Sequence, residues 1–300
     1  MKFSIVDAFA DKIFGGNPAG IVILPEGADF PADIVMVKTA AELRYSETAF
    51  IKKTGDQRFK IRYFTPAAEV DLCGHATIGA FHALLIEGMI ETGNIYIAET
   101  KAGDIAVAVN DGSILMDMAD PQLFEEISSG DALDELYGIM GLSPVDQGIC
   151  KADPDIAMIP RKVSTGLADI ILPVRDEGEL HGITPDFKAL AELSRRYEAV
   201  GVHAFTINSD DGFIHVRNFA PFYEIDEEAA TGTANGALTY YLYGYGIVRP
   251  GIVNTIVQGE RMDRPSKIST IIETKEGHEK VKVGGSAVTL ASGQINIDRS

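Results

Sequence analysis

The chain has 300 residues, of which 46% are hydrophobic and 23% are charged, and its formal net charge is −18. This composition is ordinary for a globular protein with a substantial core and roughly one to three domains. The negative charge argues against nucleic acid and anionic membranes as partners, because both require a basic surface. An anionic substrate would therefore have to be bound by local groups rather than by the overall field.

The first residues, MKFSIVDAFADKIFGG, contain Asp7 and Asp11 and lack the continuous apolar run of a signal peptide. No stretch approaches the roughly 20 apolar residues that span a bilayer. Cys73 and Cys150 are too few for a disulfide framework. We therefore expect a cytoplasmic protein.

Nothing in the residue spacing indicates a metal or a nucleotide cofactor. Neither HExxH nor CxxC occurs, and most histidines lack metal-ligand spacing, namely His82, His181, His203, His215 and His278. The stretches GGNPAG and ATGTANG do not have the spacing of GxGxxG or GxxxxGK[ST]. We expect no metal site and no organic cofactor.

Strands are predicted along the whole chain, because short apolar or alternating segments are bounded by turn residues. They cover residues 3–9, 20–25, 48–53, 59–64, 95–100, 104–109, 114–119, 169–174, 204–209, 215–220, 269–274, 288–292 and 294–297. Helical periodicity predicts helices at residues 34–43, 78–86, 187–196 and 233–243. Many strands with few helices predict an α+β fold.

One pattern occurs twice, about 155 residues apart. Phe64-Thr65-Pro66 precedes Cys73-Gly74-His75-Ala76 and an apolar helix, and Phe219-Ala220-Pro221 precedes Thr231-Gly232-Thr233-Ala234 and another. The period is too long for a solenoid. The repeat is either accidental or the trace of a duplicated domain in which each half contributes one buried helix.

The two glycine-containing helix starts are candidate anion sites. The first N–H groups of a helix have no intrahelical partner, and the helix dipole adds positive potential there. Glycine allows a ligand to approach the backbone, so Gly74 and Gly232 could help to hold a carboxylate without a lysine. The alternative is that both glycines only allow close helix packing.

Three side chains are candidates for acid–base chemistry. Glu47 begins the apolar run TAFI, where burial would raise the pKa of its carboxyl toward that of a general acid or base. From the residues alone, a solvated strand end or a partner for Arg44 is the favoured interpretation. His75 could relay a proton or be structural, and Cys73 could be a thiolate or a small buried hydrophobe.

Longer motifs connect these residues. They are Asp7-Ala8-Phe9, Gly16-Asn17-Pro18-Ala19-Gly20, Ser46-Glu47-Thr48-Ala49-Phe50, Arg62-Tyr63-Phe64-Thr65-Pro66, EVDLCGHAT at 69–77, Phe219-Ala220-Pro221, EEAATGTA at 227–234, Val283-Gly284-Gly285 and Gly293-Gln294-Ile295. In this order, over essentially the whole chain, they resemble the PhzF-like (phenazine-biosynthesis) family of the diaminopimelate-epimerase-like superfamily.

The resemblance implies two pseudo-symmetric, strand-rich barrel or roll domains, each around a central helix. We place the first at residues 1–115 plus 285–300 and the second at 116–284, with the active site in the cleft between them. It also implies a homodimer that uses neither a metal nor an organic cofactor. The implied activity is isomerisation by proton transfer on a small carboxylate-bearing substrate resembling dihydro-hydroxyanthranilate.

The resemblance assigns catalytic roles to Glu47, His75 and Glu228. Glu47 matches the proton-transferring glutamate, and His75 matches a positioning or relay histidine. The remaining residues expected at the substrate are Asn17, Ser46, Gly74, Gly232 and Thr233. In the family motif EDPATGSA, Glu228, Ala229 and Thr233 replace aspartate, proline and serine, so the dimensions of the pocket and the substrate could differ.

Two other functions remain open. Related epimerases and racemases exchange protons through two cysteines, one at each helix start, but here Thr231 stands opposite Cys73. A threonine hydroxyl is too weak an acid to act as the second thiol. The other possibility is a member of the fold that binds a small molecule or a protein without turnover.

Overall fold

The computed structural model describes residues 1–145, 148–275 and 277–297. The chain forms two compact units, Met1–Asp117 with Gly284–Ser300 and Met118–Val283. The two domains expected from the sequence include residues 146–147, 276 and 298–300, which lie outside the described residues. Within the described part, no helix has both the length and the apolar character needed to cross a membrane.

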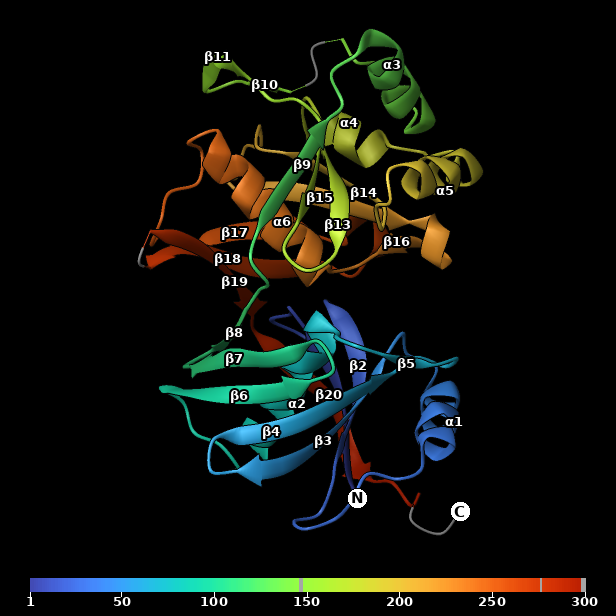
Figure 1. Ribbon diagram of the computed structural model, residues 1–300, viewed down its shortest axis with the longest axis vertical. Coiled ribbons are helices and arrows are strands. Elements are labelled where there is room, and N and C mark those ends of the chain that lie inside the picture. Colours follow the sequence, from blue (N-terminus) through green and yellow to red (C-terminus); the bar gives the residue numbers. More distant parts are fainter. Residues whose placement is uncertain (146–147, 276, 298–300) are drawn as a thin grey trace. The chain divides into compact units, whose positions relative to one another are not determined.

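The first unit is a mixed sheet with helices packed against it (Figure 1). Its strands are β1 (Lys2–Ala8), β2 (Asn17–Ile23), β3 (Thr48–Gly55), β4 (Arg58–Phe64), β5 (Glu69–Val70), β6 (Asn94–Thr100), β7 (Gly103–Asn110), β8 (Ser113–Asp117) and β20 (Ala287–Gln294). β20 pairs with β1, and the order continues through β2, β3, β4, β6, β7 and β8. The C-terminal strand thus completes the N-terminal unit.

Helix α2 (Gly74–Ile86) is the central element of this unit and packs against β1, β2, β3, β8 and β20. Its sequence is apolar on all faces, which is the pattern of a helix surrounded by protein. Phe81 and Leu84 are fully buried, and burial of such a side chain contributes about 1.5–3 kcal/mol. Helix α1 (Asp33–Leu43) packs on β3 and β4.

The second unit contains a further set of paired strands. They are β9 (Gln122–Glu126), β12 (Arg161–Ser164), β13 (Ala168–Pro173), β14 (Val202–Thr206), β15 (Ile214–Ala220), β16 (Ile225–Glu228), β17 (Asn254–Gln258), β18 (Ser266–Lys275) and β19 (His278–Gly285), with β10 (Ile149–Cys150) and β11 (Asp153–Ala157) as a separate ribbon. Its helices are α3 (Gly130–Ile139), α4 (Glu177–Gly182), α5 (Phe187–Arg196), α6 (Gly232–Gly244), η1 (Pro221–Tyr223) and η2 (Glu260–Met262).

The two units have the same pattern of strand pairing. In the series β1, β2, β3, β4, β6, β7, successive pairs are antiparallel, parallel, antiparallel, parallel and antiparallel. The series β12, β13, β14, β15, β17, β18 repeats this pattern. In each unit the buried helix, α2 or α6, follows the short strand β5 or β16. The sequence repeat therefore reflects two copies of one topology.

An arginine on the equivalent strand of each unit repeats the same contacts. Arg62 on β4 binds both carboxylate oxygens of Glu69 at 2.7 and 2.8 Å and lies 5.1 Å from the Phe64 ring centre. Arg217 on β15 binds both carboxylate oxygens of Glu227, through Nε and Nη2, each at 2.8 Å, and lies 4.8 Å from the Phe219 ring centre. Bidentate, charge-assisted bonds of this kind are geometrically specific. Each pair fixes the short strand that leads into the buried helix.

The predicted helices form, but among the described residues two α-helices were missed. Helix α5 spans the predicted residues, and its N-cap Asp186 accepts bonds from the amides of Lys188 and Ala189. Helix α3 was missed although Ser129 caps it, and α4 has only six residues. The strand predicted at 294–297 is wrong, because β20 ends at Gln294, where its partner β1 reaches the start of the chain.

Candidate active site

Glu47 lies immediately before β3, beside the start of α2. The amide of Gly20 on β2 donates to the Glu47 carbonyl at 3.3 Å, which fixes the backbone at this point. The Glu47 carboxylate forms an ion pair with His75, Oε2 to Nε2, at 3.3 Å. Its side chain is 19% exposed. Among the described residues its charged partner is therefore His75 and not Arg44, which was the other interpretation.

His75 is the centre of a group that we call the Glu47 cluster: Ser46, Glu47, Cys73 and His75. The His75 ring is 5% exposed, its Nε2 lies 3.4 Å from the Ser46 hydroxyl, and its Nδ1 lies 3.4 Å from the Cys73 sulfur. His75 is the second residue of α2, and Cys73 is the N-cap, whose side chain does not cap the helix. The cluster therefore lies at the N-terminus of the central helix.

The pKa of Glu47 does not move in the direction expected from the sequence. Burial raises it, but the His75 ring, with help from Ser46 and Cys73, lowers it more, so that the net pKa is below its usual value. The expectation that burial alone would raise this pKa is thus wrong. Glu47 is a carboxylate at neutral pH and can accept a proton directly.

The other two titratable groups respond to the same contacts. Burial lowers the pKa of His75, but its neighbours Cys73 and Glu47 raise it above its usual range. Burial and the charge of Glu47 raise the pKa of Cys73 to about 11. At neutral pH the cluster therefore contains a carboxylate, an imidazolium and a neutral thiol.

Glu47, Cys73 and His75 place three donor atoms within 4.8 Å of one another, which is close enough for one metal ion. A thiol must lose its proton to bind a metal. The raised pKa of Cys73 opposes that step.

Asn17 begins β2 and is buried. Gly16 before it has φ +63°, and an added Cβ would lie 2.1 Å from the Ala8 carbonyl oxygen, so only glycine fits there. Asn17 lies before Gly20 on the same strand, and the amide of Gly20 contacts Glu47.

In the second unit, Glu228 and the start of α6 form what we call the Glu228 cluster: Glu228, Thr231, Gly232, Thr233 and Gln258. The Thr231 hydroxyl donates to the Glu228 carboxylate at 2.6 Å. Thr231 is the N-cap of α6, but its side chain does not cap the helix. The carbonyl of Thr233 accepts from Thr165 at 3.0 Å. Glu228 thus lies at a helix start equivalent to that of α2.

Gln258 holds this loop and was not predicted. It is fully buried at the end of β17. Its amide donates to the Glu228 carbonyl at 2.7 Å and to the Thr231 hydroxyl at 3.1 Å. Its oxygen accepts from the Thr231 amide at 3.1 Å and from Asn235 at 2.8 Å. No local pattern in the sequence indicates this role, because Gln258 and its partners lie far apart in the sequence.

Asp169 on β13 is a second residue that sequence reasoning missed. It is 1% exposed, and neither carboxylate oxygen has a hydrogen-bond partner among the described residues. The Asn218 amide donates to His203 at 3.2 Å, and its proximity lowers the pKa of Asp169. Burial outweighs this effect and, with a smaller contribution from the negative charge of Glu228, raises the pKa of Asp169 to about 7. The signal was available, since Asp169 interrupts an apolar run just as Glu47 does.

The structure therefore brings Ser46, Glu47 and His75 together at the start of α2. It places Gly74 as the first residue of that helix and Gly232 and Thr233 as the first two of α6, beside Glu228. The two clusters lie in different units, one in Met1–Asp117 and the other in Met118–Val283. Each combines a carboxylate with an uncapped helix start, which is an arrangement that can bind an anion and move a proton.

Comparison with solved structures defines the class of protein. The chain matches a Bacillus anthracis phenazine biosynthesis protein of the PhzF family with a TM-score of 0.83 and 25% identity, covering 99% of both chains. A probable proline racemase from Agrobacterium radiobacter shares the fold, with a TM-score of 0.61, 16% identity and coverage of 99% of this chain and 93% of that one. The fold is thus the epimerase-like fold that the sequence indicates.

The sequence comparisons then give the family. An uncharacterized isomerase of Clostridium acetobutylicum is 33% identical over 97% of this chain and 96% of its own length. The model of the PhzC-PhzF family, described as "Phenazine biosynthesis-like protein", matches residues 6–293. The chain belongs to the PhzC-PhzF family, and it is an isomerase.

Proposed function

We propose that this protein is a cofactor-independent isomerase that transfers a proton between atoms of a small carboxylate-bearing substrate, with Glu47 as the base. The observation that carries the proposal is the Glu47–His75 ion pair at the start of α2. This pair keeps Glu47 ionised, and a general base must be deprotonated before it can act.

The other residues have supporting roles in this proposal. The first amides of α2 bind the substrate carboxylate and stabilise negative charge that develops as the proton leaves. Glu47 removes a proton and delivers it to another atom, while His75 orients the polar groups of the substrate. The family resemblance assigns Glu228 and the start of α6 to the same chemistry. Ser46 contacts His75 and helps to hold the imidazolium. Asn17 shapes the site.

Two departures from the family motif bear on the substrate. Glu228 is one methylene longer than aspartate, and its carboxylate is held by Thr231. Thr233 keeps the hydroxyl of serine but adds a methyl group. We propose that the reaction type is kept and that the dimensions of the pocket select a substrate resembling, but not identical to, dihydro-hydroxyanthranilate.

The reaction is tested by solvent exchange. The protein is incubated in D₂O with dihydro-hydroxyanthranilate and a panel of small unsaturated and β-hydroxy acids, and deuterium on carbon is followed by NMR. Product formation or carbon-bound exchange is expected for at least one compound. Carboxylates that bind without any exchange would instead support a non-catalytic binding member of the fold.

Replacing Cys73 by serine separates the proposed mechanism from a two-thiol epimerase. The Cys73 thiol is neutral, since its pKa is raised to about 11, and Thr231 occupies the second cysteine position. We expect exchange by Cys73→Ser to stay within about tenfold of the unchanged protein, because no step needs a thiolate. A loss of about 10³-fold or more, with unchanged thermal melting, would contradict this and favour a thiol base.

The remaining expectations complete the proposal. A homodimer follows from the resemblance, and sedimentation equilibrium measures it directly. A cytoplasmic location fits the two free cysteines, Cys73 and Cys150. The net charge of −18 supports a small-molecule partner over nucleic acid or membrane.

A further inference from the structure

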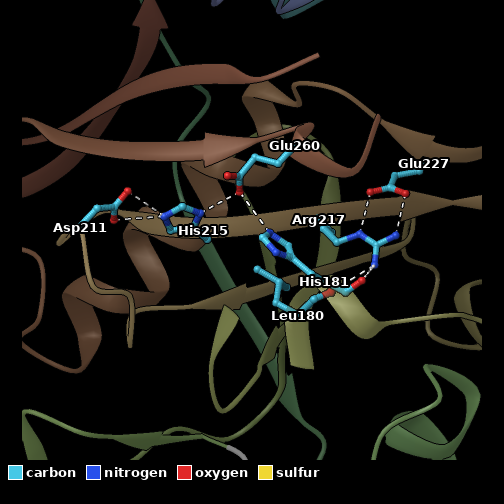
Figure 2. A network of polar contacts seen from close by, with 7 residues as sticks. All are labelled: Leu180, His181, Asp211, His215, Arg217, Glu227 and Glu260. Carbon is cyan, nitrogen blue, oxygen red and sulfur yellow. Dashed lines mark hydrogen bonds and ion pairs between the residues drawn. The ribbon is translucent and has the colours of Figure 1, made fainter. Parts of the chain in front are cut away.

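A further group of titratable side chains lies in the Met118–Val283 unit (Figure 2). His181 is in the last turn of α4, His215 is on β15, and Glu260 begins η2. Oxygen Oε2 of Glu260 lies 2.8 Å from His215 Nδ1 and 3.3 Å from His181 Nε2. All three donor atoms lie within 4.8 Å of one another. They therefore converge on one point.

The second nitrogen of His215 is held by a carboxylate. Nε2 lies 3.1 and 3.2 Å from the two oxygens of Asp211. A carboxylate that binds the outer nitrogen of a histidine fixes the ring and its tautomer, and metal-binding histidines almost always have such a partner. With Nε2 occupied in this way, Nδ1 is the nitrogen that faces Glu260 (Figure 2).

The backbone behind His181 is held in place by a buried group. Arg217, on β15 two residues after His215, donates to the carbonyls of Leu180, His181 and Ile183 at 3.1, 3.4 and 2.8 Å. The same guanidinium is fixed by Glu227 (Figure 2). The end of α4 that carries His181 is therefore tied to the strand that carries His215, so the two rings are positioned before any ligand arrives.

Glu260 is positioned by its own turn. Gly259 has φ +81°, and an added Cβ would lie 2.4 Å from the Arg264 carbonyl oxygen, so glycine is required there. The His215 side chain is 4% exposed, whereas His181 and Glu260 are 32% and 33% exposed. The point between the donors is therefore reached from solvent on one side, where a water molecule can complete a coordination shell.

The donor set discriminates among cations. Two imidazole nitrogens and one carboxylate oxygen suit zinc and its neighbours, whereas calcium and magnesium prefer oxygen ligands. Tetrahedral zinc with bonds of about 2.0–2.1 Å requires neighbouring ligand atoms roughly 3.3 Å apart. The separations of Glu260 Oε2 from His215 Nδ1 and His181 Nε2, 2.8 and 3.3 Å, lie near that value. Glu177 and Asp211 beside His215 add negative charge that attracts a cation.

We propose that His181, His215 and Glu260 bind one divalent cation of the zinc class, with water as the fourth ligand and Asp211 as the support of His215. The site joins α4, β15 and η2, and its role is to stabilise the second unit. The proposal differs from the sequence expectation of no metal site, because the ligands lie 45 and 79 residues apart and no local motif connects them. It does not depend on the proposed reaction.

The test is calorimetric titration of Zn²⁺ into full-length protein that has been stripped with a chelator. We expect saturable binding of one ion and a higher melting temperature. His181→Ala and His181→Gln should each weaken binding by about 100-fold or more, and Asp211→Asn by about tenfold. His278→Ala, an exposed histidine outside the group, is the matched control and should bind as the unchanged protein does.

Cobalt(II) identifies the ligands and excludes the Glu47 cluster. Co²⁺ bound to nitrogen and oxygen gives visible bands without a thiolate charge-transfer band, and Cys73→Ser should leave both spectrum and affinity unchanged. The proposal is overturned by absence of saturable Zn²⁺ binding, by an affinity in both His181 variants that equals that of the unchanged protein, or by binding that is lost in Cys73→Ser. In each of those cases the group at His215 is an ion-pair network only.

Discussion

Glu47→Gln is expected to lower the rate of carbon-bound deuterium exchange by about 10²–10⁴-fold, which is the range that a general base contributes. Glutamine has nearly the shape of glutamate, but its amide cannot accept the substrate proton. The carboxylate that it replaces is ionised beside His75, 3.3 Å away. The measurement is the NMR exchange assay, using whichever compound of the panel the unchanged protein turns over.

The matched control is Glu99→Gln. Glu99 belongs to the same unit and pairs with Arg58 at 2.7 Å, away from the Glu47 cluster. Glu99→Gln should catalyse exchange at the rate of the unchanged protein, and both variants should have its melting temperature. Exchange that persists in Glu47→Gln within about threefold would mean that another group is the base. Altered ligand binding in a protein that never catalyses exchange would indicate a binding protein.

Asp169→Asn is expected to change how the stability of the protein depends on pH. The pKa of Asp169 is about 7 in the folded chain, against an ordinary value of 3.8. Below 3.8 both states are protonated and the residue has no effect. Between 3.8 and 7 the unfolded chain loses a proton that the folded chain keeps, so folding becomes less favourable as the pH rises. Above 7 the penalty is constant, on the order of 4 kcal/mol.

Asparagine cannot ionise and therefore removes this pH dependence. The free energy of unfolding of Asp169→Asn, relative to the unchanged protein, should increase by on the order of 2–3 kcal/mol between pH 5 and pH 8. Urea unfolding at the two pH values measures it. Asp210→Asn, an exposed aspartate in the same unit, is the control and should show no such change. Parallel curves for Asp169→Asn would mean that the buried carboxyl is not held in its neutral form.

The sequence predicts the elements of the site better than its electrostatics. The motifs around Glu47 and His75 place both residues correctly at the start of a buried helix. The predicted direction of the shift in the Glu47 pKa was wrong, because the shift depends on His75, which lies on another element. Burial can be inferred from a single apolar run. The charge that opposes the effect of burial on the pKa comes from a residue that only the tertiary structure brings near.

The same limit explains what was missed. Gln258 reaches the Glu228 loop from β17, and the three candidate metal ligands come from α4, β15 and η2. Local spacing cannot reveal such groups. Helix α3 is a different case, since Ser129 and the spacing of Leu133, Leu136, Tyr137 and Met140 gave a readable signal. Asp169 was also readable, by the argument already applied to Glu47.

The pairing of β20 with β1 has a consequence for how the chain is made. The second unit is continuous in sequence, from Met118 to Val283, so it has all its residues before translation ends. The first unit lacks a strand until β20 leaves the ribosome, and until then β1 presents one unpaired edge. During synthesis the part that begins first is therefore finished last. The Met1 ammonium, bonded to the Ile295 carbonyl at 3.0 Å, lies where the start of β1 meets the segment that follows β20.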